Sequence, residues 1–170
     1  FENVESKIEN FFSLVQNKTI NLIIKNNETK INSSLSIDGD IIFFDSSNHD
    51  NTITKIQNNT IFTYDFQNER LIIENADENF LSFFKFKNFN DYKVIKKSIF
   101  EDNHRITYSN NIYTLEIDFN EELNRIMKIK VVQNENIYFE VEILKIFENN
   151  NTIEKLLITN DWKTVDWRVE

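Results

Sequence analysis

The chain has 170 residues, enough for one domain that buries roughly two-thirds of the surface its unfolded form exposes. It carries 19 basic and 28 acidic residues, a formal net charge of −9, without a long basic run. Nucleic-acid binding is therefore disfavoured, because such binding draws most of its affinity from neutralising phosphates. The absence of cysteine excludes disulfides and thiolate metal sites.

The first segment with a clear period is an amphipathic helix. Val4, Ile8, Phe11, Phe12 and Val15 recur at the spacing that places side chains on one stripe of a helix. The period then changes to two, which is typical of strands. We therefore expect an N-terminal helix that leads directly into a sheet.

Short alternating segments fill most of the remaining chain. The only glycine, Gly39, lies between two aspartates and predicts a turn, and Gln67 with Asn68 predicts a hairpin connection. Strands are expected at residues 20–25, 31–37, 40–45, 51–56, 60–66, 69–75, 92–100, 104–109, 111–119, 125–132 and 136–147, with short apolar segments at 155–158 and 163–169. This pattern predicts a large antiparallel sheet of about ten to eleven strands that curls upon itself.

Several of the later strands have one apolar and one polar face. Leu115, Ile117 and Phe119, for example, alternate with Glu116 and Asp118. One face of the sheet is therefore solvated, and the other must be covered by apolar groups. The N-terminal helix and a short Phe-rich helical candidate that begins near residue 77 are a small cover for so large a sheet. Either the sheet closes over a filled core, or it stays half-open around an apolar cavity with the helices as a lid.

Few residues indicate catalysis or metal binding. His49 and His104 lie in separate polar segments and are interpreted as solvated loop residues. The aspartates between residues 38 and 50 lack the spacing of an EF-hand loop, and a single glycine cannot build a phosphate-binding loop. We predict no enzyme activity, no metal and no cofactor, although a carboxylate pair from distant strands would not be visible in the sequence.

The order of these segments resembles the LolA lipoprotein-carrier family. KIENFFSLVQNKTINLII at 7–24 resembles its helix-to-strand start, and DGDIIFF at 38–44 resembles its aromatic strand. The most specific match is TIFTYD at 60–65, similar to the family's Thr, apolar, aromatic, any residue, Tyr, Asp/Asn segment. Asp38 and Gly39 stand where family members usually carry Arg-Pro, so the latch that this arginine is thought to provide is absent or replaced.

The resemblance implies an α+β, mostly β fold: an unclosed β-barrel in which a strongly curved antiparallel sheet carries an N-terminal helix and a short Phe-rich plug helix on its concave face. Residues 1–170 would form this single domain. The implied function is a periplasmic chaperone that carries lipoproteins from the inner to the outer membrane, with a signal peptide removed before Phe1. The implied partners are acylated lipoproteins as cargo, an inner-membrane lipoprotein-releasing ABC transporter complex and an outer-membrane acceptor. The carrier would act as a monomer.

The predicted acyl-chain lining consists of apolar residues taken as facing inward along the strands. They are Leu35, Ile37, Phe62, Tyr64, Leu71, Ile73, Leu115, Ile117, Phe119, Met127, Ile129, Phe139, Val141 and Ile143. The predicted lid comprises Phe80, Leu81, Phe83 and Phe84, on a short helix that Asp77 would cap. The alternatives are a LolB-like lipid-anchored acceptor with the same fold, and a non-enzymatic surface or interaction domain with a filled β-core.

Overall fold

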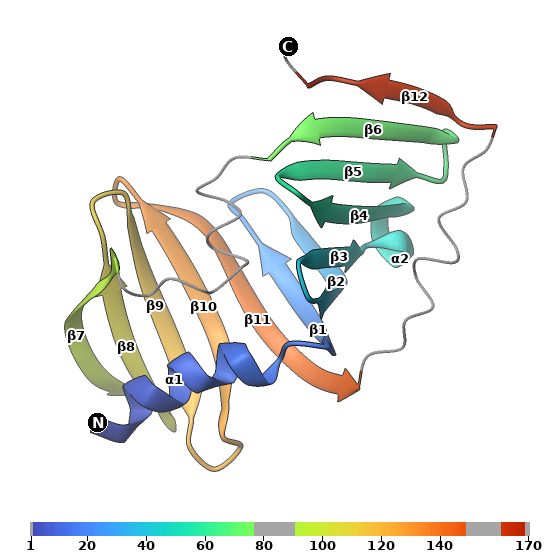
Figure 1. Cartoon of the computed structure of the whole chain (residues 1–170). Coiled ribbons are helices and arrows are strands. Elements are labelled where there is room, and N and C mark those ends of the chain that lie inside the picture. The colour runs from blue at the N-terminus through green and yellow to red at the C-terminus, as the bar shows by residue number, and fades with distance from the viewer. Residues whose placement is uncertain (1, 77–90, 149–160, 169–170) are drawn as a thin grey trace.

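The computed structural model describes residues 2–76, 91–148 and 161–168, and in this part of the chain twelve strands form one sheet (Figure 1). The strands are β1 (Lys18–Lys25), β2 (Lys30–Asp38), β3 (Ile41–Asp45), β4 (Thr52–Gln57), β5 (Thr60–Asp65), β6 (Arg70–Asn75), β7 (Lys93–Phe100), β8 (Asn103–Ser109), β9 (Tyr113–Asn120), β10 (Arg125–Gln133), β11 (Asn136–Glu148) and β12 (Lys163–Asp166). Their order across the sheet is β12-β6-β5-β4-β3-β2-β1-β11-β10-β9-β8-β7.

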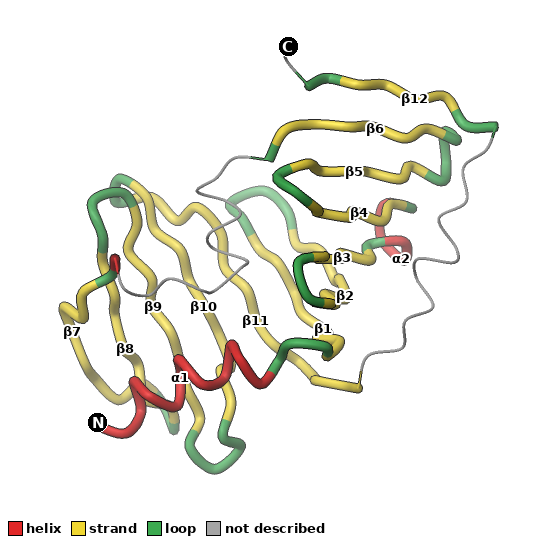
Figure 2. Tube along the Cα trace, in the orientation of Figure 1, coloured by secondary structure: helices red, strands yellow, loops and turns green. Residues whose placement is uncertain are grey.

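The sheet is curved and unclosed. β7 and β12 lie at its two ends in the strand order and are not neighbours. β12 pairs with β6 in parallel, whereas the other pairs are antiparallel and most join consecutive strands. Figure 2 shows how strands dominate the described chain. The predicted fold class, α+β and mostly β with an unclosed barrel, is confirmed.

The predicted N-terminal helix is α1 (Glu2–Leu14), which lies across the sheet in front of β8 to β11 (Figure 1). Its apolar stripe is buried: Val4, Ile8 and Phe11 are at most 4% exposed, and Val15 just beyond the helix is equally covered. The side chain of Phe12 lies outside the described part of the structure. We call the face of the sheet that α1 covers the inner face and the opposite one the outer face.

Asparagine takes much of the turn role that glycine has in other chains. The predicted turn at Gly39 is present, with a φ of +59°, and it joins β2 to β3. Among the described residues, the non-glycine positions with positive φ are six asparagines and three glutamates: Asn17, Asn51, Asn58, Asn59, Asn124, Asn134, Glu69, Glu101 and Glu135. Asparagine tolerates the left-handed region better than most residues. An Asn-rich chain can therefore make many tight hairpins with one glycine.

Two predicted segments lie outside the described residues: the Phe-rich helix within 77–90, and the apolar stretch at 155–158. The short helix α2 (Ser47–Asp50) was not predicted and interrupts the polar connection between β3 and β4. Among the helices that the structure describes, none combines the length and the apolar character needed to cross a bilayer.

Candidate functional site

The inner face has a filled half, formed by β8 to β11 beneath α1. Ile106, Ile117 and Ile129 lie side by side across three of these strands, since each is the direct cross-strand partner of the next. Ile8 of α1, Ile106 and Ile117 are 0% exposed. Burial this complete indicates close packing of the helix on the sheet.

Most of the predicted lining belongs to the buried core that includes the filled half. Eight of the fourteen residues are members of this one cluster: Leu35, Ile37, Leu115, Ile117, Phe119, Ile129, Val141 and Ile143. They share the inner face, as expected, and the cluster also contains the apolar stripe of α1. Whether any of them contacts an acyl chain stays a prediction.

Four predicted lining residues lie on the outer face, which corrects the expectation that they face inward: Phe62, Tyr64, Leu71 and Ile73. Direct cross-strand partners project to the same face of a sheet. The inner-face residue Ile42 pairs with Ile56, which in turn pairs with Ile61. The neighbour of Ile61, Phe62, must therefore project outward.

These outer-face residues form apolar pairs of their own. Phe62 pairs with Ile73, and Tyr64 pairs with both Ile53 and Leu71. Tyr64 and Ile53 are buried, yet neither belongs to the core cluster beneath α1. Because these strands carry apolar residues on both faces, the alternation of apolar and polar residues cannot show which face is the inner one.

A β-bulge in β10 removes Met127 from the inward position that the sequence predicted for it. The register of β10 against β9 shifts between Ile126 and Lys128, so that Ile126, and not Met127, is the partner of Phe119. Ile126 is 0% exposed and belongs to the core, whereas Met127 is only half-buried. A bulge inserts one residue and reverses the alternation on one side of it. Ile126 therefore takes the inward position that was predicted for Met127.

Beyond α1, the inner face has an open half, formed by β2 to β5 with the adjoining ends of β1 and β11. A cavity of about 480 Å³ lies on it, within the range of about 300–1,000 Å³ typical of ligand sites. It is lined by Ile24, Asn26, Ile31, Ser33, Phe44, Ser46, Asp50, Thr52, Thr54, Ile56, Ile61, Thr63, Tyr138 and Phe139. Of the predicted lining residues, Phe139 alone is among them.

Along β4 and β5 the cavity has an apolar end and a polar end, and Ile24, Ile31, Tyr138 and Phe139 add apolar lining from β1, β2 and β11. Ile56 and Ile61 are cross-strand partners on β4 and β5, and Thr54 and Thr63 form the next inward pair along the same strands. Thr52 is the next residue of β4 with its side chain on the inner face, and it follows α2 closely in the chain. Moving along β4, the lining therefore changes from isoleucine to hydroxyl groups.

Hydrogen bonds fix the side chains at the polar end. The hydroxyls of Ser33 and Ser46 are 2.5 Å apart. Thr52 donates its hydroxyl to Asp50 Oδ1 at 2.6 Å and its backbone N–H to the same oxygen at 3.1 Å. This geometry suits an elongated amphiphile, whose apolar part would lie over the isoleucines and whose polar part would reach the hydroxyls. Sequence reasoning missed the threonines and serines because it sought only apolar residues as lining.

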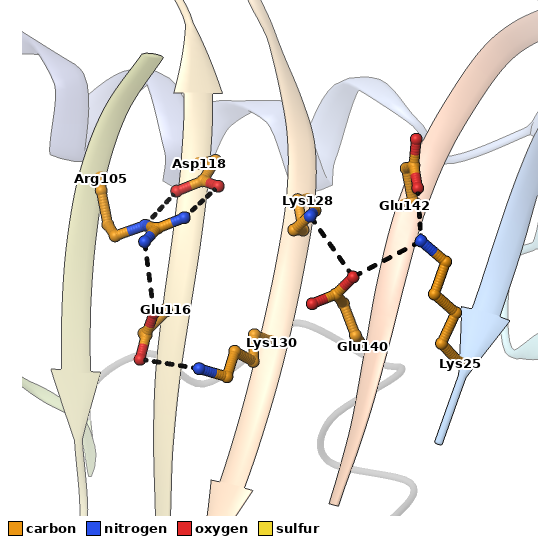
Figure 3. Close-up of polar contacts among 8 residues, drawn as sticks. All are labelled: Lys25, Arg105, Glu116, Asp118, Lys128, Lys130, Glu140 and Glu142. Carbon is orange, nitrogen blue, oxygen red and sulfur yellow. Dashed lines mark hydrogen bonds and ion pairs between the residues drawn. The ribbon is translucent and has the colours of Figure 1, made fainter. Parts of the chain in front are cut away.

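The outer face of the filled half is polar. Four basic and four acidic side chains alternate across β8, β9, β10, β11 and β1 (Figure 3): Arg105, Glu116, Asp118, Lys128, Lys130, Glu140, Glu142 and Lys25. Arg105 donates two hydrogen bonds of 2.6 and 2.8 Å to the carboxylate of Asp118, and these bonds raise the pKa of the guanidinium. The Lys25 ammonium, 3.0 Å from Glu142, lowers the pKa of that carboxyl. The face that was predicted to be solvated is thus the outer face, and it carries a network of ion pairs.

The histidines have different surroundings. His49 lies in α2, exposed. His104 was predicted to lie in a loop, but it belongs to β8, and its Nε2 is 3.0 Å from a carboxylate oxygen of Glu121. Within the described residues, no three His, Cys, Asp or Glu side chains gather as a metal site would require.

No family model matches the chain, and no curated protein matches it by sequence. Among solved structures, an uncharacterised conserved protein from Thermus thermophilus matches with a TM-score of 0.61 at 8% identity, over 97% of this chain and 98% of that one. This match shows a shared fold along the whole of both chains.

Two further structures match less well. A LolA superfamily protein from Nitrosomonas europaea, NE2245, gives a TM-score of 0.47 at 8% identity, over 92% of this chain and 96% of that one. MucB of Pseudomonas aeruginosa, in its complex with MucA, gives 0.40 at 9% identity, over 96% of this chain and 62% of that one. The architecture itself, an unclosed curved sheet crossed by an N-terminal helix, is the one that the sequence resemblance implied.

Proposed function

We propose that this chain is a non-enzymatic carrier, a single domain that binds acyl chains in the cavity of the open half. The observation that carries the proposal is the cavity of about 480 Å³, with an apolar end, on the part of the inner face that α1 leaves uncovered. The resemblance to the LolA family supports lipoproteins as the source of the acyl chains and the periplasm as the compartment.

A carrier is needed because acyl chains cannot cross water alone. Three chains of a lipoprotein anchor contain on the order of 40 methylenes, and at ~0.8 kcal/mol each their exposure would cost on the order of 30 kcal/mol. The apolar lining supplies compensating burial for the part of these chains that enters the cavity, and no reaction is needed. Release must also be possible, so the closed and open states of the carrier can differ by only a few kcal/mol.

Two partners follow from this role: an inner-membrane lipoprotein-releasing ABC transporter complex that loads the carrier, and an outer-membrane acceptor that unloads it. A LolB-like lipid-anchored acceptor would use the same cavity. The second candidate from another class is a protein-interaction domain, which the closely packed core of the filled half favours. Such a domain would not take up acyl ligands.

Binding of N-phenyl-1-naphthylamine, a neutral apolar fluorophore, tests the proposal. The purified chain should enhance its fluorescence with a micromolar dissociation constant, and a triacylated lipopeptide should displace it. Thr63→Trp places a large ring in the cavity and should weaken binding at least tenfold.

The matched control is Thr60→Trp, because Thr60 lies on the same strand with its side chain on the opposite face. This variant should bind as the unmodified chain does. If a folded, monomeric chain binds neither the fluorophore nor the lipopeptide, the carrier function is wrong and the interaction domain stands.

A further inference from the structure

The polar groups of the cavity are of an unusual kind for a site that binds fatty compounds. They comprise six hydroxyls, one amide from Asn26 and one carboxylate from Asp50. The hydroxyls belong to Ser33, Ser46, Thr52, Thr54, Thr63 and Tyr138. Among the described residues that line the cavity, none is basic. A fatty-acid carboxylate or a phosphate placed there would meet a negative charge and, among these described residues, no positive partner.

The carboxylate lies at the polar end. Asp50 ends α2 and accepts both hydrogen bonds from Thr52 with a single oxygen, Oδ1, while its side chain is exposed at the rim. An amphiphile whose tail lies over Ile56 and Ile61 would bring its head group toward Thr52 and Asp50. The charge of the head group would therefore lie next to the carboxylate of Asp50, where the acyl chain leaves the apolar end.

We infer that this cavity selects amphiphiles by the charge of the head group: it accepts acyl chains joined through neutral ester or amide groups and rejects anionic ones. The inference rests on the proposed carrier function. Hydroxyl and amide groups can satisfy an ester or amide through hydrogen bonds. An anion loses its hydration there without gaining a cationic partner from the described lining, and Asp50 together with the net charge of −9 repels it.

Selection by head-group charge would distinguish lipids whose acyl tails are the same. A carrier built in this way would leave free fatty acids and anionic phospholipids in the membrane, while accepting glyceride-type or amide-linked chains. Nothing in the apolar end distinguishes these classes, since both present methylenes to Ile56 and Ile61. Discrimination therefore depends on the polar end alone.

Competition between two ligands with the same tail tests this inference. Monopalmitoylglycerol and palmitate, each below its critical micelle concentration at pH 8, are titrated against bound N-phenyl-1-naphthylamine. The glyceride should displace the fluorophore at a concentration at least tenfold lower than palmitate does. Equal potency of the two ligands would overturn the inference and leave the carrier function standing. If neither displaces the fluorophore, the carrier function itself fails.

Two variants that each remove one negative charge locate the effect. Asp50→Asn retains an oxygen that accepts from Thr52, and it should tighten palmitate binding about fivefold while changing glyceride binding less than twofold. Asp38→Asn alters an exposed carboxylate at the end of β2, which does not line the cavity, and should change neither. An equal gain in both variants would assign the selection to overall charge and contradict a role for Asp50. The ratio measured with the unmodified chain decides the inference even if a variant fails to fold.

Discussion

The two halves of the inner face use the same sheet for opposite purposes. In the filled half, the cross-strand row of Ile106, Ile117 and Ile129 lies beneath α1 within a closely packed core. In the open half, a different cross-strand row includes Thr54 and Thr63, and the cavity lies over it. The two halves therefore differ in what covers them: α1 packs on the filled half, and the cavity lies on a part of the sheet that α1 does not reach. Stability and binding should therefore separate along the sheet.

The largest effect is expected from truncating an isoleucine in each half. Ile117→Ala should lower the free energy of unfolding by about 3–4 kcal/mol, because it removes fully buried methylenes and leaves a void beneath α1. Ile61→Ala removes the same atoms beside a space that already exists, and it should cost about 1 kcal/mol. Urea unfolding of both variants measures the contrast. Equal losses would mean that the open half is as closely packed as the filled half.

A smaller effect is expected from the outer face of the filled half. Arg105→Gln leaves Asp118, which is only 4% exposed, without its bidentate partner, and should lower the free energy of unfolding by about 2 kcal/mol. Lys130→Gln breaks a longer, 3.4 Å contact with a half-buried Glu116 and should cost less than about 0.5 kcal/mol. Chemical denaturation of the two variants tests the ranking, which a larger loss in Lys130→Gln would reverse.

The smallest effect concerns pH and the β5–β6 hairpin, at the far end of the open half. Asp65 accepts hydrogen bonds from Arg70 at 2.8 Å and from Asn68, and these lower the pKa of its carboxyl below the ordinary 3.8. A lowered pKa stabilises the fold above pH 3.8, and this contribution is lost as the pH falls through the lower folded-state value. Asp65→Asn should therefore be less stable than the unmodified chain at pH 7.

The same two proteins should approach equal stability as the pH falls through the lowered folded-state pKa of Asp65. Urea midpoints at pH 7, 5, 3 and 2 give the comparison. A difference between the two proteins that stays constant over this range would show that Asp65 acts through hydrogen-bond geometry and not through its charge.

The sequence predicted the elements better than the faces. The stripe of Val4, Ile8 and Phe11 identified α1 because a helix with one buried side leaves an unambiguous period. The hairpin of β5 and β6 was found from its turn residues. Residues 77–90, which contain the predicted lid, lie outside the described structure, and the lid stays a prediction.

The inner and outer faces were harder to predict, because alternation divides the residues of a strand between two faces without showing which face is the inner one. In β5, Ile61 and Phe62 are both apolar, and only the register through β4 and β3 shows that Ile61 faces inward. The bulge at Met127 has no sequence signal, and it exchanges one apolar residue for another. The threonines of the cavity could have been suspected from their alignment on neighbouring strands, but this alignment requires the register to be known.

The central claim is that acyl chains bind in the open half of the inner face, and protection of a single thiol tests it most directly. The chain has no cysteine, so Thr63→Cys and Thr60→Cys each introduce one thiol on β5, on the inner and outer face respectively. A saturating triacylated lipopeptide should slow the reaction of Thr63→Cys with a maleimide at least tenfold and leave that of Thr60→Cys unchanged. Equal reaction rates at Thr63→Cys with and without bound lipopeptide would contradict the account.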